Sequence, residues 1–456
     1  MTADHAPLTT KDLLDAIREA VAARDEGLLR AALRDVHPAD VAEILPGLDT
    51  DERRLAFRVL RKRGPDVLSE VDKELQQELL DLLEDEEVVW FTQQLPSDEA
   101  VDVLGVLPDE RQRRVLGLLS EPEAKKIRRL LKFPEDTAGG IMATEVVAVR
   151  EDALAAEAIE LLRDRAEGIE EYQRIYVVDA SGRLVGTLSL GRLLLAKPGM
   201  PVSQIMAGEV ISVPTDMDQE EVAAVVRKYD LVAVPVVDAE GRLVGSISVD
   251  DVVDVIQAEA TEDVARLAGT TDAELGEESV LRVSTIRLPW LVIGLLGGIV
   301  SAALMSRFEH SLQTVLALAF FVPVITAMGG NVGMQSSAIV IRGLALGQFN
   351  ILDVPRRLSR EFAIALVNGI ICGTLLSIVA ALWRNDPRLG LVVGVSMMSS
   401  MIVAAMTGTF FPILLKRFRI DPALAGGPFI TISNDILNLL IYFSVAHVSL
   451  SWLARR

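Results

Sequence analysis

One acidic residue stands in the last apolar stretch of the chain, where a charge is costly. Asp435 lies in the segment Ile-Thr-Ile-Ser-Asn-Asp-Ile-Leu (430–437), and no Lys or Arg occurs between Arg419 and Arg455. An ionised carboxylate near the middle of a bilayer costs roughly 2.5 to 3.5 kcal/mol on insertion scales, so such residues usually serve an ion or proton path. The alternative is a neutral Asp that holds helices together. We expect the first role, with Asp435 as the only acidic group inside any membrane span.

A second set of polar groups occurs in an earlier apolar stretch. The segment 329–337 reads Gly-Gly-Asn-Val-Gly-Met-Gln-Ser-Ser. It predicts a bent or interrupted helix whose freed carbonyl and amide oxygens line a wet cavity, the alternative being a face of small residues for helix packing. Asn331 and Gln335 are one helical turn apart, so they share a face if the helix persists. With Asn434 and Asp435 they would offer neutral oxygens and a carboxylate, which suits a hard cation such as Mg²⁺.

The composition divides the chain into a soluble part and a membrane part. The chain has 456 residues, 24% of them charged, yet its mean hydropathy is +0.35, which is unusual for one globular domain. From Arg287 onward we count about 13 basic and about 6 acidic residues, so the preceding part carries about −27 within a total of −20. A strongly anionic soluble part argues against nucleic acid as a partner and favours cations.

Five apolar stretches are long enough to cross a bilayer. They cover about 288–306, 312–345, 361–383, 389–415 and 424–453. The two longest, 312–345 and 424–453, run well beyond the ~20 residues that a span needs and contain Gly, Pro and polar breaks, so we expect bent or interrupted helices. Basic residues lie before the first stretch and between the second and third, which places the amino terminus in the cytoplasm. We expect a multi-pass protein of a bacterial-type inner membrane.

The soluble part contains one weak and one strong repeat. Residues 1–132 read as short helices with apolar residues at three- and four-residue spacing, broken by prolines, which predicts a small superhelical domain. The segment 175–186 (IYVVDASGRLVG) reappears at 234–245 (VPVVDAEGRLVG), and each copy predicts a β-hairpin with an Asp/Gly turn. Upstream, Met142-Ala143 matches Met206-Ala207. This pattern resembles the paired cystathionine-β-synthase (CBS) domain, over about 138–256.

The resemblance to CBS domains bears on nucleotide binding. In CBS domains that bind adenine nucleotides, a Ser or Thr after the hairpin is commonly followed three residues later by an Asp that contacts the ribose. The second copy has Ser248 and Asp251 in this pattern, whereas the first has Ser189 and Arg192. ATP binding is therefore doubtful, although Arg192 could contact a phosphate group instead.

An acidic segment follows the second copy. Four carboxylates fall within an arc of about 140° if residues 250–263 form a helix: Asp251, Asp254, Glu259 and Glu262. A solvated helix face is the simpler interpretation of such a charge run. Because the helical domain and the second CBS copy also carry acidic groups, these surfaces would repel one another unless cations lay between them.

The order of these segments resembles the MgtE family of magnesium channels from about residue 30 to the end, with GGNVGMQSS (329–337) and DPAL (421–424) followed by Asp435 as its most specific motifs. The resemblance implies a multidomain membrane protein. It consists of an all-α superhelical N-terminal domain (1–132), α/β paired CBS domains (133–256), a connecting (plug) helix (250–280) and a five-helix transmembrane domain (286–456). It also implies a homodimeric Mg²⁺ channel whose pore lies between subunits and closes when cytosolic Mg²⁺ is plentiful.

The same resemblance implies two sets of metal-binding residues. Asp435 would lie at the pore site, with Asn331, Gln335 and Asn434 lining the pore. The residues for sensing cytosolic Mg²⁺ would be Asp66, Asp98, Asp102, Gly140, Asp216, Glu220, Asp230, Asp250, Asp251, Asp254, Glu259 and Glu262. One departure concerns the last span, where the family often has Asn before the first Pro and this chain has Gly427 before Pro428.

Two other functions are compatible with the sequence. A proton- or sodium-coupled exporter would use Asp435 as a titrating carrier, and a membrane-anchored cation or adenylate sensor would transport nothing. An enzyme is not expected, because no Ser-His-Asp, Cys-His or phosphate-loop arrangement is present in the sequence.

Overall fold

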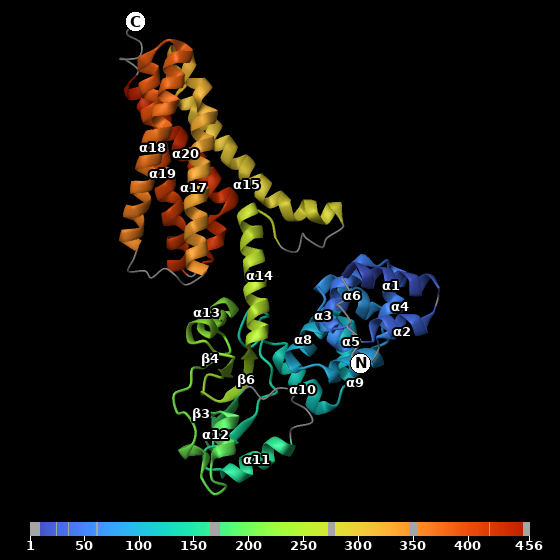
Figure 1. The fold of residues 1–456 in the computed structure, drawn as a ribbon. Helices are drawn as coiled ribbons and strands as arrows, with labels where there is room; N and C mark the ends of the chain where they lie inside the picture. Colours follow the sequence, from blue (N-terminus) through green and yellow to red (C-terminus); the bar gives the residue numbers. More distant parts are fainter. Residues whose placement is uncertain are drawn as a thin grey trace, which may run out of the picture. The chain divides into compact units, whose positions relative to one another are not determined.

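The computed structural model describes residues 10–449 except 24, 35, 61–62, 165–173, 272–278, 346–353 and 419. The chain divides into two compact units, Met1–Val255 and Ile256–Arg456. Figure 1 shows the first unit as a group of short helices and two small sheets, and the second as long helices. This is the multidomain membrane architecture expected from the sequence.

The N-terminal domain is built of short helices that bury their apolar faces. These helices are α1 (Thr10–Ala22), α2 (Glu26–Leu33), α3 (Pro38–Ile44), α4 (Thr50–Val59), α5 (Gly64–Ser69), α6 (Lys73–Asp81), α7 (Asp85–Gln94), α8 (Ser97–Gly105), α9 (Asp109–Leu118) and α10 (Glu121–Leu130). Capping boxes at Asp49 and Ser120 start α4 and α10, because each side chain satisfies an orphan backbone N–H. Leu29, Leu79 and Val103 are fully buried in the shared core.

Each CBS copy has the predicted hairpin beside one further strand. The strands are β1 (Ala148–Arg150), β2 (Ile175–Val178) and β3 (Leu184–Leu188) in the first copy, and β4 (Val213–Pro214), β5 (Ala233–Val237) and β6 (Leu243–Ser248) in the second. In both sheets the first strand pairs in parallel with the second, which pairs antiparallel with the third. Gly182 and Gly241 hold the turns at φ values of 83° and 79°, where a side chain would be strained.

The two copies pack on each other reciprocally. Leu184 N donates to Gly241 O and Leu243 N donates to Gly182 O, each at 3.1 Å. An ideal Cβ on Gly186 would lie 2.6 Å from Met206 Sδ, and one on Gly245 would lie 2.7 Å from Met142 Sδ. Each methionine therefore packs on the hairpin of the other copy. Helices α11 (Ala155–Asp164), α12 (Leu190–Leu195) and α13 (Gln219–Tyr229) complete the pair.

A continuous helix, α14 (Val249–Ala268), follows β6 and crosses the boundary between the units at Val255. Ser248 donates its hydroxyl to Asp251 at the start of this helix, and the Asp251 carboxylate also accepts from Ser248 N at 3.0 Å. This local cap explains why the helix begins directly after the strand.

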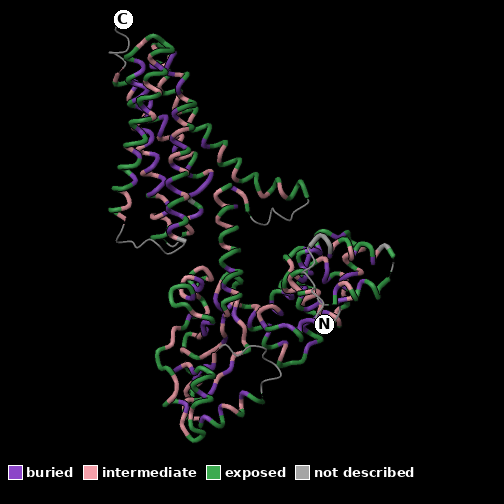
Figure 2. Tube along the Cα trace, viewed as in Figure 1, coloured by how far each residue is buried: buried purple, intermediate pink, exposed green. Residues whose placement is uncertain are grey.

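The second unit contains five helices that are long and apolar enough to cross a membrane, as expected. They are α15 (Val280–Arg307), α17 (Val322–Ala345), α18 (Val354–Arg384), α19 (Pro387–Arg417) and α20 (Gly427–Val448). The short helix α16 (Glu309–Thr314) and the 3₁₀ turns Leu316–Phe321 and Pro422–Ala425 precede α17 and α20. Figure 2 shows buried residues concentrated on the helices in the middle of this unit, and α19 carries the most extensive buried face.

The prediction of a break at residues 329–337 is wrong, although the second apolar stretch (312–345) is divided earlier, at the 3₁₀ turn Leu316–Phe321. Helix α17 runs without interruption through Gly329–Ser337. Its glycines serve close packing instead, because an ideal Cβ on Gly408 of α19 would lie only 2.3 Å from Gly333 O. Helices α18 and α19 also approach closely, with ideal Cβ atoms on Gly373 and Gly394 lying 2.7 and 2.6 Å from the opposite carbonyl oxygen. Small residues on these faces let the backbones meet.

Candidate functional site

A group of carboxylates gathers where the N-terminal domain meets the first turn of α14. We call Asp66, Asp98, Glu99, Asp102 and Asp251 the acidic cluster. Asp98, Glu99 and Asp102 lie on α8, and each is repelled by the negative charge of Asp251 on α14. Asp66 of α5 acts on Glu99 in the same way. The structure therefore brings together four of the residues expected to sense cations, and it adds Glu99, which the sequence analysis missed.

The acidic cluster holds its charge at a cost. Burial, followed by the charge of Asp251, raises the pKa of Asp98 to about 7, and the Asp98 Oδ1 atom is buried without a hydrogen-bond partner. Burial also raises the pKa of Asp102 to about 6; Lys73 opposes this rise, while Glu135 and Asp251 add to it. Asp102 is exposed, whereas Asp98 is partly buried, so Asp98 is the more enclosed of the two carboxylates. A cation bound among these carboxylates would favour their ionised form, because it offsets both their burial and their mutual repulsion.

Of the other expected sensing residues, Asp250 and Asp254 flank the acidic cluster on α14, and Asp216 and Asp230 lie elsewhere on the second CBS copy. Asp216 and Asp230 are exposed, on the loop after β4 and at the end of α13. Asp250 and Asp254 lie beside Asp251 on α14 and raise the pKa of its carboxyl, after the larger effect of burial. Within the part of the chain that the structure describes, no three or more His, Cys, Asp or Glu side chains form a group able to hold a metal ion. The acidic cluster is thus an arrangement of charge without a closed coordination shell.

Two further residues from the predicted set have structural surroundings of their own. Gly140 lies in a tight turn, where an ideal Cβ would lie 2.3 Å from Pro134 O, so a side chain there would displace the backbone. Glu220 lies in the first turn of α13. Its backbone N–H is bound by Asp218, the N-cap of that helix, at 2.8 Å.

The second half of α14 contacts the segment that begins α20. Arg266 forms ion pairs with Glu262 on its own helix and with Asp421 in the loop before α20. Glu262 is therefore already paired with a cationic side chain. Asp263 lies between Glu262 and Arg266 in the sequence. Burial, followed by the charge of Glu259, raises the pKa of its carboxyl, while Arg266 opposes the rise.

Glycines make this contact close. Gly427 has a φ of 50°, and an ideal Cβ there would lie 2.7 Å from Leu267 O. On the other side, an ideal Cβ on Gly269 would lie 2.9 Å from Pro428 Cγ. The Gly427 that departs from the family pattern is thus a position where both the backbone angle and the neighbouring helix require glycine. We call these groups, together with the Arg266–Asp421 ion pair, the α14–α20 contact.

Helix α17 presents its two amides away from the helices that pack on it. Asn331 and Gln335 are exposed in this chain and lie on one face, as expected from their spacing. Asp435 on α20 is partly buried. Asn434, by contrast, is fully buried, accepts a hydrogen bond from Thr407 Oγ1 at 2.7 Å, and lies against Gly333. Its amide is therefore enclosed among helices of this chain.

A second acidic residue lies within the spans, contrary to expectation. Glu361 on α18 is 5% exposed, pairs with Arg357 at 3.2 Å, and accepts a hydrogen bond from Ser336 Oγ at 3.3 Å. Its position beside Arg357 at four-residue spacing was visible in the sequence as a helical ion pair. Glu361 is thus paired with a basic residue of its own helix, whereas α20 carries no Lys or Arg beside Asp435.

Comparison with known proteins gives matches along most of the chain. Family models match as "MgtE intracellular N domain" at residues 36–136, as CBS domain at 138–199 and 202–258, and as "Divalent cation transporter" (MgtE) at 322–445. The magnesium transporter MgtE of Thermus thermophilus is 38% identical over 440 residues, covering 95% of this chain and 98% of the relative. The chain belongs to the MgtE family. The Bacillus subtilis MgtE is 35% identical, covering 91% of this chain and 93% of the relative.

A solved structure bears on the soluble part of this MgtE chain. The cytosolic domain of the Mg²⁺ channel MgtE in complex with ATP is 37% identical, with a TM-score of 0.51, and covers 53% of this chain and 99% of that structure. In the present chain, Ser248 and Asp251 contact each other, as noted above. In the first copy, Ser189 caps α12 by accepting from Arg192 N at 3.3 Å, and the Arg192 side chain is exposed.

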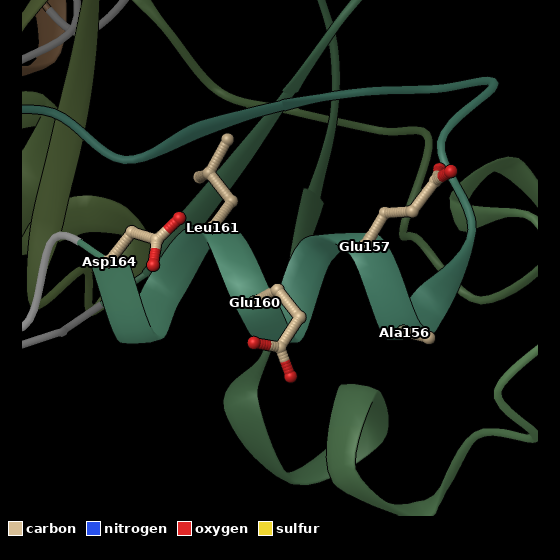
Figure 3. Close-up of a pocket in the computed structure, with 5 residues that line it drawn as sticks. All are labelled: Ala156, Glu157, Glu160, Leu161 and Asp164. Atoms are coloured by element: carbon tan, nitrogen blue, oxygen red, sulfur yellow. The ribbon is translucent and has the colours of Figure 1, made fainter.

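A shallow hollow on α11 does not contribute to these sites in the MgtE chain. It is lined by Ala156, Glu157, Glu160, Leu161 and Asp164. Figure 3 shows that the Glu157 and Glu160 carboxylates point in different directions, so they do not converge on a ligand.

Proposed function

We propose that this protein is a Mg²⁺-selective channel or transporter of a cell (inner) membrane, with its N-terminal and CBS domains in the cytosol. The proposal is supported by family membership, by relatives named magnesium transporters over nearly their whole length, and by five apolar helices, of which α20 carries Asp435 with no Lys or Arg beside it. Magnesium keeps much of its hydration shell and is held by one or two carboxylates. Transport of this kind needs no chemical step, so the protein is not proposed as an enzyme.

The pore is proposed to lie at the interface of a homodimer. Asn331 and Gln335 support this, because two polar amides on an exposed face of a membrane helix need water or a partner subunit. A two-fold axis beside that face would bring two copies of Asp435 to one pathway. Asn434 is left out of the proposed lining, since its side chain is enclosed within the subunit.

Gating is proposed to depend on cytosolic Mg²⁺ at the acidic cluster. A divalent cation there would cancel the repulsion between α8 and the first turn of α14, and its loss would let these elements separate. For nucleotide, the second CBS copy is proposed as the better of the two sites, because it alone keeps the Ser–Asp pair; ATP affinity is expected to be weak.

The observation that carries the proposal is Asp435, and its substitution tests it. Asp435→Ala should abolish Mg²⁺ flux into proteoliposomes while the protein still inserts and dimerises, because no other carboxylate on α20 can replace it. Asp435→Asn keeps the shape and removes the charge, so it should lose selective flux as well. Glu361→Gln is the control for loss of a membrane carboxylate outside the pathway.

The same assay separates the alternatives. Currents that reverse at the Mg²⁺ equilibrium potential, whatever the proton and sodium gradients, support a channel. Reversal that follows a proton or sodium gradient would instead indicate a coupled exporter. Wild-type flux in both Asp435 variants would refute the pore assignment, and no Mg²⁺ flux in the wild-type protein would leave a non-transporting sensor.

A further inference from the structure

Helix α20 carries two fully buried asparagines, Asn434 and Asn438, whose amides are incompletely paired. Asn438 has neither its Nδ2 nor its Oδ1 atom in a hydrogen bond, and Asn434 has an unpaired Nδ2. Burying an amide without partners is unfavourable, so apolar residues would serve better if packing area were all that mattered. The cost of burying these amides points to a role beyond filling space.

Both amides fit against glycines of α17. An ideal Cβ on Gly329 would lie 1.8 Å from Asn438 Nδ2, and one on Gly333 would lie 1.8 Å from Asn434 Nδ2. Each amide thus occupies the space that a side chain on α17 would fill. The pairs are one helical turn apart on both helices, in the order that antiparallel helices require.

Thr407 holds the Asn434 amide in this orientation. Its Oγ1 donates to Asn434 Oδ1 at 2.7 Å, which leaves Nδ2 against Gly333. In the part of the chain that the structure describes, the Asn438 amide has no such partner and is held by packing against Gly329.

The glycine–amide contacts favour one rotation of α20 on α17, because the amides fit only where α17 lacks a side chain. The positions one residue before Gly329 and Gly333 are Met328 and Val332, whose side chains pack in the apolar core of this unit. A rotated or shifted α20 would bring its amides against these side chains. Helix α19 also packs on α17 at Gly333, since an ideal Cβ on Gly408 would lie 2.3 Å from Gly333 O.

We propose that Asn434 and Asn438 are positioning residues that set the rotation of α20 on α17 and so aim Asp435 into the ion pathway. This inference rests on the proposed function. Asp435 follows Asn434 by about 100° around α20, and Asn331 lies about 200° around α17 from Gly329, so one fixed contact determines both directions. Selectivity for Mg²⁺ then depends on side chains that do not touch the ion.

A size exchange between the two helices tests the contact. Gly329→Ala should lower the thermal midpoint of the purified full-length protein by roughly 2 to 10 °C, because its methyl group overlaps the Asn438 amide. Adding Asn438→Ala should recover most of that loss. Gly330→Ala is the matched control, since an ideal Cβ there has nothing within 4 Å; its midpoint should not fall. Strictly additive effects of the two substitutions would overturn the contact.

Ion selectivity tests the positioning role. Asn438→Ala and Asn434→Ala should lower the ratio of Mg²⁺ to Ca²⁺ flux in proteoliposomes, whereas Gly330→Ala should keep the wild-type ratio. Unchanged selectivity in both asparagine variants would overturn the proposal and leave a packing role. The melting experiment needs no transport, so a wild-type protein without Mg²⁺ flux would refute the proposed function while the contact itself was still measured.

Discussion

Asp98 makes the acidic cluster sensitive to pH as well as to divalent cations. Its pKa is raised from 3.8 to about 7 in the folded protein, first by burial and then by Asp251. The folded state therefore holds this proton more tightly than the unfolded state. The stabilisation is fully present below pH 3.8 and is lost as the pH rises through about 7.

We therefore expect the protein without Mg²⁺ to unfold at a higher temperature at pH 6 than at pH 8. Asp98→Asn should reduce this difference, because the neutral amide no longer titrates, and should also reduce the stabilisation by Mg²⁺ at pH 8. Thermal unfolding of the purified protein at the two pH values measures both effects. Asp109→Asn, an exposed change on α9, should behave as the wild type. Equal pH dependence in the two variants would show that Asp98 does not titrate in this range.

The sequence points to some candidate site residues and not to others. It predicts Asp435 from a carboxylate in an apolar stretch, and Asp98 and Asp102 from a family resemblance. Their roles stay predictions, although the structure does place Asp98 and Asp102 near Asp251. Glu99 was missed because it contributes only through three-dimensional proximity to Asp251 and Asp66. The enclosure of Asn434 could not be seen either, since it depends on a glycine about 100 residues earlier in the chain.

At the scale of helices, the α14–α20 contact is expected to favour the closed state. Arg266→Gln removes one cation from between Glu262 and Asp421. Because the groups are about one-third exposed, we expect a loss of about 1 kcal/mol, or a roughly fivefold shift toward the open state. Mg²⁺ flux at high cytosolic-side Mg²⁺ should rise accordingly.

The pairing itself can be tested with Asp421. Asp421→Asn should give the same rise in flux, and the double variant should add little to either change. Arg266→Lys should fall between wild type and Arg266→Gln, because an ammonium group bridges two carboxylates less well than a guanidinium group. Independent, additive effects of Arg266→Gln and Asp421→Asn would mean that the two residues act separately.

The helices and hairpins themselves followed from local patterns. Both CBS hairpins were predicted because an Asp/Gly turn between two apolar strands has few alternative conformations, and Gly182 and Gly241 adopt the required positive φ. The continuity of α17 was not predicted, because glycines weaken an isolated helix by about 1 kcal/mol each. Here close packing of α19 and α20 on Gly333 outweighs that propensity.

Over the whole molecule, charge is divided unevenly between the parts. The soluble part carries about −27, whereas the residues from Arg287 onward carry about +7. Repulsion in the soluble part acts over about one Debye length, roughly 8 Å at physiological salt, so only neighbouring groups such as those of the acidic cluster contribute strongly. Regulation by divalent ions can therefore be local even in a protein whose total charge is high.

Helix α14 carries the acidic cluster's Asp251 in its first turn and Arg266 of the α14–α20 contact in its last. The two residues are about 22 Å apart along the axis. A helix of this length can couple its two ends only while its middle turns stay helical. Ala258→Gly with Ala260→Gly would soften exposed positions and leave both end contacts in place.

We expect flux through this double-glycine variant to respond only weakly to Mg²⁺. Mg²⁺ should still stabilise the cytosolic domains against heat, but the Mg²⁺ dependence of flux should become shallower, since bending would absorb the motion at one end before it reached the other. Ala258→Gln with Ala260→Gln, which keeps helix propensity, is the control. An unchanged Mg²⁺ dependence in the glycine variant would mean that the signal travels by a route other than the stiffness of α14.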